Sequence, residues 1–173
     1  MHRGKILAAL LVVLLAYSSF ATWKWRETEK SKDNAIDDLE GLANHAAICL
    51  EQSGEVSYLL DKNASDETLR GYSRLFEGCA RVLELVEIDL YLLTKDPKHY
   101  DLHVFGSTLE TLFHKAAFDS INGPRPILLK NKDRIANISR TLEDLMIKRK
   151  GVWNLTPEDI KKLRKMAEEI EWN

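Results

Sequence analysis

Apolar residues recur along most of this chain at alternating spacings of three and four, the pattern of an α-helix that packs against other helices. The clearest case lies in residues 69–93. There the pattern runs without a break through Leu69, Tyr72, Phe76, Cys79, Leu83, Val86, Leu90 and Leu93. Four further residues widen the apolar surface of this segment: Leu75, Val82, Leu85 and Leu92. The spacing predicts a long helix at the centre of a helical bundle.

A compatible pattern precedes this segment and predicts a helix over residues 34–60. Its apolar positions are Leu39, Leu42, Ala46, Cys49, Val56 and Leu60. Gly54 interrupts the helix interior, which costs about 1 kcal/mol but does not forbid the helix. A turn at residues 61–65 then reverses the chain, so the two helices are expected to be antiparallel neighbours.

Residues that favour helix ends delimit a third and a fourth helix. Asp96 offers a side-chain acceptor and Pro97 is preset for the first helical turn, so the third helix is expected to begin there. Its inward residues are Leu102, Phe105, Leu109, Leu112 and Ala116. Asn122, Gly123 and Pro124 are expected to end it, since Pro cannot continue a helix. The fourth helix ends near Gly151 and carries Leu128, Ile135, Ile138, Leu142 and Leu145.

A short last helix is predicted to begin at Thr156 and Pro157. Leu155 can pack on Ile160 across its first turn. The inward positions of this helix are Ile160, Leu163, Ala167 and Ile170. Because the connections between all these helices are short, consecutive helices should be antiparallel. The sequence therefore predicts an all-α, up-and-down bundle of four or five helices over residues 34–173.

The first 25 residues follow a different pattern. Ile6 to Trp23 is a run of eighteen uncharged residues, long enough to cross a bilayer core at about 1.5 Å per residue. A basic tail, residues 1–5, precedes it, and a charged juxtamembrane stalk, residues 26–33, follows it. We expect residues 6–25 to be a transmembrane signal anchor. Its interfacial end is Trp23, Lys24, Trp25 and Arg26. The alternative is a secretory signal cleaved near Ala21.

The arrangement of the amino terminus also predicts the side on which the bundle lies. Basic residues flank both ends of the span, so their count does not decide its orientation. A short basic head before a single apolar span is typical of segments that translocate their carboxyl side, which places residues 27–173 outside the cytoplasm. Asn63, Asn137 and Asn154 begin Asn-x-Ser/Thr triplets that could then accept glycans. Ser65 and Thr156, within two of these triplets, have the alternative role of helix caps.

The two cysteines, Cys49 and Cys79, lie at equal distances from residue 64, near the middle of the predicted turn. In an antiparallel helix pair they would therefore lie at the same height. Outside the cytoplasm they could form a disulfide, whereas in a reducing compartment they would be two small buried thiols. A third possibility is a weak metal site that combines both cysteines with His45, four residues before Cys49.

The other histidines give no clear sign of a site. His99 and His103 lie four residues apart, and His114 should reach the height of Cys79, although on the wrong helix face. Each histidine is expected to be solvated or at an edge of the core. No nucleophile motif, phosphate-binding glycine loop or paired Glu-x-x-His motif occurs, so no catalytic residue and no cofactor is predicted.

The net charge of −2 hides an uneven distribution. Residues 33–124 hold 17 acids and 7 Lys or Arg, whereas residues 125–165 hold 12 Lys or Arg and 5 acids. We call the following residues the basic face: Lys148, Arg149, Lys150, Lys161, Lys162, Arg164 and Lys165. They can complement the acidic helices beside them, or bind an anionic partner such as lipid headgroups. Nucleic acid is a poor candidate because interleaved aromatic residues are missing. Trp153 and Trp172 flank the last helix as candidate contact residues.

These features predict a single-pass membrane protein whose extracytoplasmic bundle is a protein interaction, scaffold or sensor-like module. Membrane lipid would surround its first helix, and a protein of the envelope would be its partner. In outline the arrangement resembles the helical-bundle ectodomains of membrane sensors. One alternative is a bundle that binds a small ligand or a metal ion. The other is a secreted helical protein released by signal cleavage.

Overall fold

The computed structural model describes the backbone of residues 2–172 and the side chains of residues 18, 19 and 21–172. Within these residues every regular element is a helix. The chain divides into two units, Met1–Asp37 and Asp38–Asn173, and helix α1 (His2–Leu50) contributes to both. The all-α fold class predicted from the apolar spacing is therefore confirmed.

The first unit is the amino-terminal part of α1. Most side chains of the predicted anchor, residues 6–25, lie outside the described residues. Among the residues that are described, no helix is both long enough and apolar enough to cross a membrane. The described side chains from residue 18 to residue 35 are exposed. Lys24 pairs with Glu27 at 3.0 Å, and the Trp25 indole N–H donates to Glu29 at 3.2 Å.

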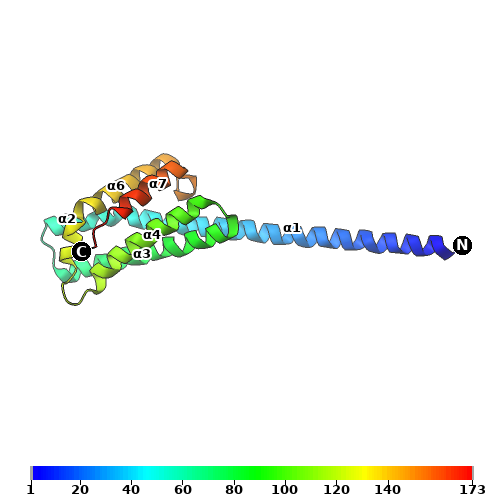
Figure 1. Ribbon diagram of the computed structural model, residues 1–173, viewed down its shortest axis with the longest axis horizontal. Coiled ribbons are helices and arrows are strands. Elements are labelled where there is room, and N and C mark those ends of the chain that lie inside the picture. The colour runs from blue at the N-terminus through cyan, green and yellow to red at the C-terminus, as the bar shows by residue number, and fades with distance from the viewer. Residues whose placement is uncertain (1, 173) are drawn as a thin grey trace. The chain divides into compact units, whose positions relative to one another are not determined.

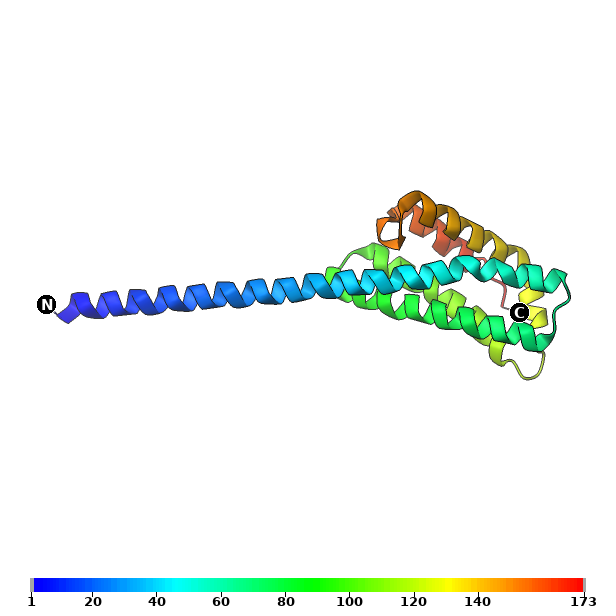
Figure 2. The ribbon, with the colours of Figure 1, turned by 180° about the vertical axis from the view of Figure 1, so that it is seen from behind.

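The second unit is a bundle of helices connected by short turns. After α1 come η1 (Glu51–Gly54), α2 (Glu55–Asp61), α3 (Asp66–Thr94), α4 (Pro97–Phe118), α5 (Arg125–Lys130), α6 (Lys132–Arg149), η2 (Val152–Asn154) and α7 (Pro157–Glu168). Helices α3 and α4 form a long antiparallel hairpin, and α6 and α7 lie side by side (Figures 1 and 2). Helix α7 packs against α4, and α6 packs against η1 and α2. The helical bundle is thus confirmed.

The core lies around the α3–α4 hairpin and contains large aromatic and aliphatic side chains. Phe76, Phe105, Phe113, Leu50, Leu69, Leu83, Leu90, Leu102, Leu109, Leu112, Leu128 and Ile135 are fully buried. The rings of Phe76 and Phe113 have centroids 5.5 Å apart. A Cβ at Gly106 would lie 2.9 Å from the backbone nitrogen of Glu84. The two helices therefore approach too closely here for any residue larger than glycine.

Side-chain caps begin three of the helices where the sequence predicted them. Ser65 accepts a hydrogen bond from the backbone N–H of Thr68 at 3.2 Å, and Asp96 accepts one from Lys98 at 3.0 Å. At α7, Thr156 and Asp159 form a reciprocal capping box. These caps satisfy backbone N–H groups that have no partner within the helix, which fixes the start of each helix.

The helix predicted over residues 34–60 is interrupted by a 3₁₀ turn, η1. The cause is the close packing of α6 against this segment. The Ser139 hydroxyl donates to the backbone carbonyl of Glu51, and a Cβ at Gly54 would lie 2.8 Å from the Ser139 Oγ. The lack of a side chain at Gly54 thus leaves room for Ser139 to contact the interrupted turn.

The predicted third and fourth helices also end or break at positions that differ from the prediction. Helix α4 ends at Phe118 rather than at Asn122. The predicted fourth helix consists of α5 and α6, which meet at Asn131. The Asn131 side chain donates to the backbone carbonyl of Ile127, and this local bond competes with helix continuation.

Helix α3 buries a narrower face than the sequence predicted. Leu69, Phe76, Leu83, Val86 and Leu90 are buried. The four residues expected to widen this surface are exposed instead: Leu75, Val82, Leu85 and Leu92. The covered part of α3 is therefore one stripe of its circumference.

Candidate ligand-binding pocket

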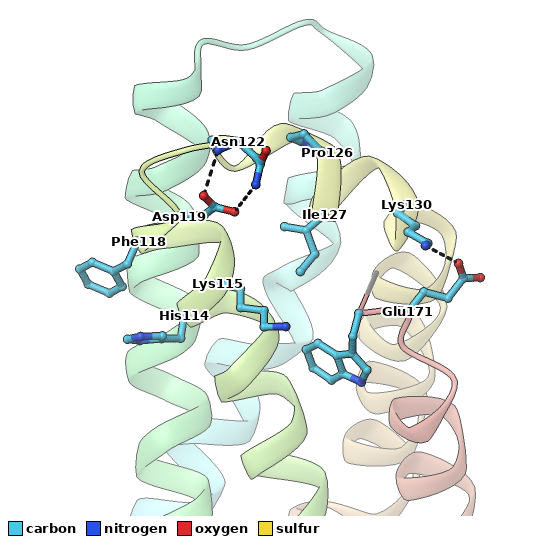
Figure 3. Close-up of a pocket in the computed structure, with 11 residues that line it drawn as sticks. His114, Lys115, Phe118, Asp119, Asn122, Pro126, Ile127, Lys130 and Glu171 are labelled. Carbon is cyan, nitrogen blue, oxygen red and sulfur yellow. Dashed lines mark hydrogen bonds and ion pairs between the residues drawn. The ribbon is translucent and has the colours of Figure 1, made fainter.

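An open pocket lies at one end of the bundle, between α4, the loop that follows it, α5 and the segment after α7. Its volume is about 580 Å³, within the range typical of small-molecule sites. The lining residues are His114, Lys115, Phe118, Asp119, Asn122, Gly123, Pro126, Ile127, Lys130, Glu171 and Trp172. Figure 3 shows Lys115 of α4 and Ile127 of α5 both pointing into the space between these two helices.

The loop on one side of the pocket is shaped by Asp119, the residue that ends α4. Its Oδ1 accepts hydrogen bonds from the backbone N–H groups of Ile121 and Asn122, both at 2.9 Å. Its Oδ2 accepts one from the side-chain amide of Asn122 at 3.2 Å (Figure 3). These bonds stabilise the carboxylate and lower the pKa of Asp119, with those from Asn122 contributing most.

Arginine side chains from other elements hold this loop against α3. Arg70 of α3 donates to the backbone carbonyls of Ala117 at 2.9 Å and of Asp119 at 2.7 Å. Arg125 pairs with Asp66 at 3.3 Å. Gly123, with φ +73°, lies close to Asp66, and a Cβ there would come within 3.1 Å of that carboxylate. The left-handed backbone and the lack of space together require glycine at this position.

The opposite side of the pocket is formed by the C-terminal segment, which we define as residues 169–172. Asn131 is fully buried and clamps this segment. Its amide nitrogen donates to the backbone carbonyl of Glu171 at 2.9 Å, and its amide oxygen accepts from the Glu171 N–H at 2.8 Å. The Glu171 carboxylate also pairs with Lys130 at 3.2 Å and Arg134 at 2.7 Å. Hydrogen bonds from these two cations lower the pKa of Glu171.

This clamp holds Trp172, the next residue, against Lys115 of α4. The Lys115 ammonium nitrogen lies 5.1 Å from the centroid of the Trp172 ring, a cation–π contact. Among the residues that the structure describes, no carboxylate pairs with Lys115. The rings of His114 and Phe118, on the same helix, are in tilted contact with centroids 4.8 Å apart. The pocket therefore combines aromatic walls with one cation that has no anionic partner.

Such a lining suits an amphipathic ligand with an apolar or aromatic part and an anionic group. Phe118 and Trp172 offer flat apolar surface, and Lys115 offers a positive charge. The two oxygens of Asp119 are already engaged by three N–H donors. The arrangement is therefore one of recognition groups around an aromatic pocket.

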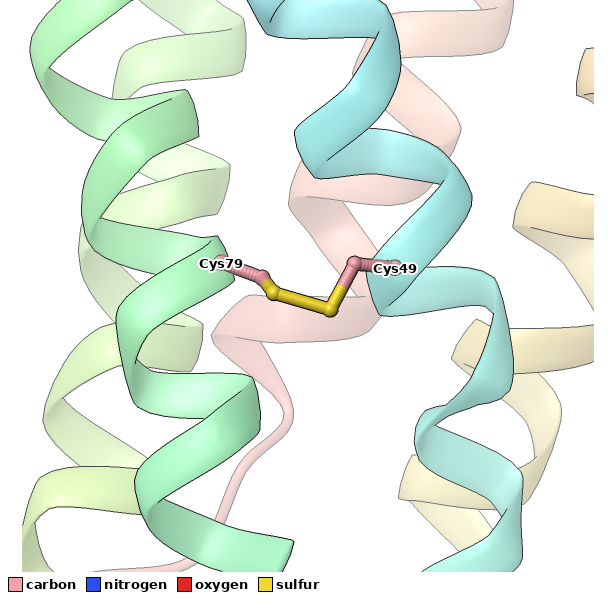
Figure 4. The surroundings of a disulfide bond; sticks show 2 residues. All are labelled: Cys49 and Cys79. Atoms are coloured by element: carbon pink, nitrogen blue, oxygen red, sulfur yellow. A yellow bond between two sulfur atoms is a disulfide. The ribbon is translucent and has the colours of Figure 1, made fainter.

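The cysteines lie elsewhere, on neighbouring turns of α1 and α3. Cys49 and Cys79 form a disulfide with Cα atoms 6.1 Å apart (Figure 4). Of the three interpretations that the sequence left open, the structure contains the bridge. The metal site of His45, Cys49 and Cys79 is wrong for this oxidised protein, because bonded sulfur atoms offer no thiolate to a metal. His45 itself is exposed.

The histidine expectation is wrong for His99. This side chain is buried between α3 and α4, and its Nδ1 lies 2.7 Å from Oε2 of Glu87, which is also buried. Burial of the Glu87 carboxyl raises its pKa, and the hydrogen bond from His99 opposes that shift. His103 is half-buried, with its Nδ1 3.0 Å from the carbonyl oxygen of Glu84. His114 is exposed and contacts Glu77 on α3.

The basic face divides into paired and unpaired residues. Arg149 pairs with Asp159 at 2.8 Å, and Arg164 pairs with Asp101 at 2.6 Å and with Glu168 at 2.8 Å. The other five are exposed and have no ion pair within the described part of the chain: Lys148, Lys150, Lys161, Lys162 and Lys165. The arginines thus serve the fold, and the lysines remain available to a partner.

The remaining predicted surface residues are accessible. Trp23, Lys24, Trp25 and Arg26 are exposed on α1. Asn63, Asn137 and Asn154 are exposed as well, and the Asn63 side-chain oxygen accepts from Arg125 at 3.2 Å. The hydroxyls of Ser65 and Thr156 have the capping role described above. The glycan and membrane-interface assignments stay predictions.

Comparison with known proteins gives no relative from which a role could be transferred. No protein-family model matches the chain, and neither a curated protein nor a solved structure matches it.

The pocket was not predicted from the sequence, because it forms between residues 114–130 and the C-terminal segment. Trp172, singled out as a candidate contact residue, was its one signal in the sequence.

Proposed function

We propose that this protein is a membrane-anchored, extracytoplasmic helical bundle that recognises a small amphipathic anion in the pocket between α4, α5 and the C-terminal segment. The observation that carries the proposal is the pairing of Trp172 with Lys115 at 5.1 Å beside an open pocket. A cation above an aromatic ring provides both a flat apolar surface and a charge for one ligand. This is the recognition role of a sensor-like module.

The pocket assignment is tested by calorimetric titration of the full-length chain in lipid nanodiscs. Indoleacetate is a suitable probe because it joins an aromatic ring to a carboxylate, and indoleacetamide is its neutral analogue. Trp172→Ala should weaken binding of both compounds by about tenfold. Lys115→Met should weaken binding of indoleacetate much more than that of the amide.

Lys165→Met is the matched control, since it removes an unpaired lysine on α7, outside the pocket. It should leave both affinities unchanged. Binding that is unaffected by Trp172→Ala and Lys115→Met would rule out recognition at this pocket. If Lys115→Met weakened the binding of both compounds equally, the charge of Lys115 would have no part in recognition.

The sequence of residues 6–25 supports the membrane anchor, and the disulfide supports the location outside the cytoplasm, because structural disulfides persist mainly in oxidising compartments. The test is protease digestion of a carboxyl-terminal tag in cells with the outer envelope made permeable and the inner membrane sealed. Digestion of the tag together with cysteines that resist alkylation is the expected result. A protected tag would place the bundle in the cytoplasm.

A second candidate surface is the set of five unpaired lysines on and around α6 and α7. Their charge favours an anionic partner, and lipid headgroups are the simplest such partner for a protein anchored in a bilayer. This role is compatible with ligand recognition because Lys148, Lys150, Lys161, Lys162 and Lys165 do not line the pocket.

A further inference from the structure

Three potential metal ligands meet on the outer side of the α3–α4 hairpin. Glu77 lies on α3, and Glu110 and His114 lie one turn apart on α4. The ligand atoms of these three residues lie within 4.8 Å of one another. The Nδ1 atom of His114 is 2.9 Å from Oε1 of Glu77. We call this group the Glu–Glu–His cluster.

The packing of the hairpin brings the cluster together. Phe76 and Phe113 are in contact inside the core, with ring centroids 5.5 Å apart. Glu77 and His114 are the residues that directly follow these two phenylalanines in the sequence, and they meet at the edge of the same contact. Glu110 joins them because side chains four residues apart lie on one face of a helix. Rigid helices, rather than a loop, therefore hold all three ligands.

The cluster combines two carboxylates with one imidazole. The Glu77 side chain is only 13% exposed, whereas the His114 side chain is 55% exposed. Within the described residues neither Glu77 nor Glu110 forms an ion pair with a lysine or arginine. A divalent cation among these three side chains would interact favourably with both carboxylates.

We propose that Glu77, Glu110 and His114 bind a divalent transition-metal ion of the Zn²⁺ class. Carboxylate oxygens and an imidazole nitrogen form a donor set that such ions accept. Three protein ligands leave a position on a tetrahedral ion for water or an external ligand. Ligand atoms of a tetrahedral Zn²⁺ site lie about 3.3 Å apart, so modest side-chain rotations of the three residues would complete the site.

The cluster adjoins the ligand pocket through His114, which lines it. A metal ion bound to this imidazole would therefore lie beside the pocket. The metal proposal stands on the geometry of its three ligands and does not depend on the pocket ligand. The two proposals share only His114, and their tests can fail separately.

The test is a competition titration of Zn²⁺ between a chromogenic chelator and the full-length chain in nanodiscs. We expect one equivalent of Zn²⁺ per chain. Each of Glu77→Gln, Glu110→Gln and His114→Gln should weaken the affinity by at least about tenfold, since each removes one ligand. His45→Gln and Glu143→Gln replace an exposed histidine and an exposed glutamate elsewhere, and should leave the affinity unchanged.

Thermal unfolding separates loss of metal binding from loss of folding. Zn²⁺ should raise the melting temperature of the wild type and of both controls, and should raise that of His114→Gln less at the same Zn²⁺ concentration. Metal-free His114→Gln should melt like the metal-free wild type, because its side chain is exposed. Absence of stoichiometric binding in the wild type, or binding that survives in all three ligand variants, overturns the proposal. Indoleacetate binding measured without metal remains an independent result.

Discussion

The α3–α4 hairpin and the α5–α7 half of the bundle are held by different interactions. In the hairpin, Phe76, Phe105 and Phe113 are fully buried, and Gly106 lets the two backbones come close. The α5–α7 half also packs apolar side chains against the rest of the bundle, among them Leu128, Ile135 and Leu163. In addition, surface ion pairs join it to the hairpin and to α2. These include Arg125–Asp66, Lys132–Asp61 and Arg164–Asp101.

The two kinds of interaction contribute to different properties: apolar burial mainly to stability, and polar contacts mainly to the geometry of the sites. Apolar burial accounts for most of the free energy of folding, whereas an exposed ion pair contributes about 0–1 kcal/mol. The large buried side chains of the hairpin should therefore contribute more to stability than the ion pairs of the α5–α7 half. The polar contacts of the α5–α7 half mainly determine where Trp172 and the pocket walls lie.

The largest effect is expected in the hairpin core. Phe105→Ala should lower the free energy of unfolding by about 3–5 kcal/mol, because it removes buried apolar surface and leaves a cavity. Urea-induced unfolding monitored by circular dichroism measures the change. Ile147→Ala, at a highly exposed site on α6, should change it by less than about 0.5 kcal/mol. Similar losses in both variants would mean that burial of Phe105 does not stabilise the hairpin core.

A smaller effect is expected at the clamp of the C-terminal segment. Asn131→Ala should cost about 1–3 kcal/mol, because it removes a fully buried amide and its two hydrogen bonds to the backbone of Glu171. It should also detach Trp172 and abolish binding in the pocket. Calorimetry with indoleacetate provides the second readout, and Asn137→Ala on the exposed face of α6 is the control. Intact binding in Asn131→Ala would show that the clamp does not position the pocket.

Glu87 provides a pH test of the hairpin. Burial raises its pKa above the ordinary value of 4.5, Glu40 adds to that shift, and His99 and Lys98 oppose it. The stabilisation from a raised pKa is fully present below the unfolded pKa and is lost as the pH rises through the folded pKa. Relative to Glu87→Gln, the wild type should therefore lose stability as the pH rises above 4.5.

Chemical denaturation of both proteins from about pH 4 to about pH 8 measures this difference. Glutamine keeps a hydrogen-bonding side chain of similar size next to His99, so the comparison isolates the titration of Glu87. Parallel stability curves for the two proteins would mean that Glu87 titrates alike in the folded and unfolded states.

The smallest effect on stability is expected at the basic face. Reversal of Lys161, Lys162 and Lys165 to Glu should change the free energy of unfolding by less than about 1 kcal/mol, since the three have no ion pair in the described structure. Cosedimentation with anionic vesicles should nevertheless decrease, and neutral vesicles should show no difference. A collapse of stability would mean that these lysines serve the fold.

The sequence allowed most helix boundaries to be predicted because they depend on local chemistry. Ser65, Asp96 and Thr156 each accept a hydrogen bond from a backbone N–H group of the helical turn that follows. Residue type and local spacing are sufficient to predict such a cap. The end of α4 could not be located in this way. Arg70, which lies far away in the sequence, binds the carbonyls at that end, and the Asp119 side chain takes the backbone N–H groups that follow.

The two candidate sites show the same limit. The hairpin arithmetic placed His114 at the height of Cys79, within one turn of its actual neighbour Glu77. The prediction placed His114 on the wrong face of its helix, so it did not find the contact with Glu77. The pocket depends on Asn131, whose two hydrogen bonds reach a segment 40 residues later. A contact between residues this far apart in the sequence cannot be predicted from the spacing of neighbouring residues.

The disulfide also determines how mechanical tension passes through the chain. Cys49 and Cys79 join α1 directly to α3 across a separation of 30 residues. A pull applied to the two termini of the oxidised protein would therefore travel through the sulfur bridge and bypass residues 50–78, which include η1, α2 and the first part of α3. That part of the chain would bear no load along its backbone, while the second part of α3, α4 and the clamp at Asn131 would bear it.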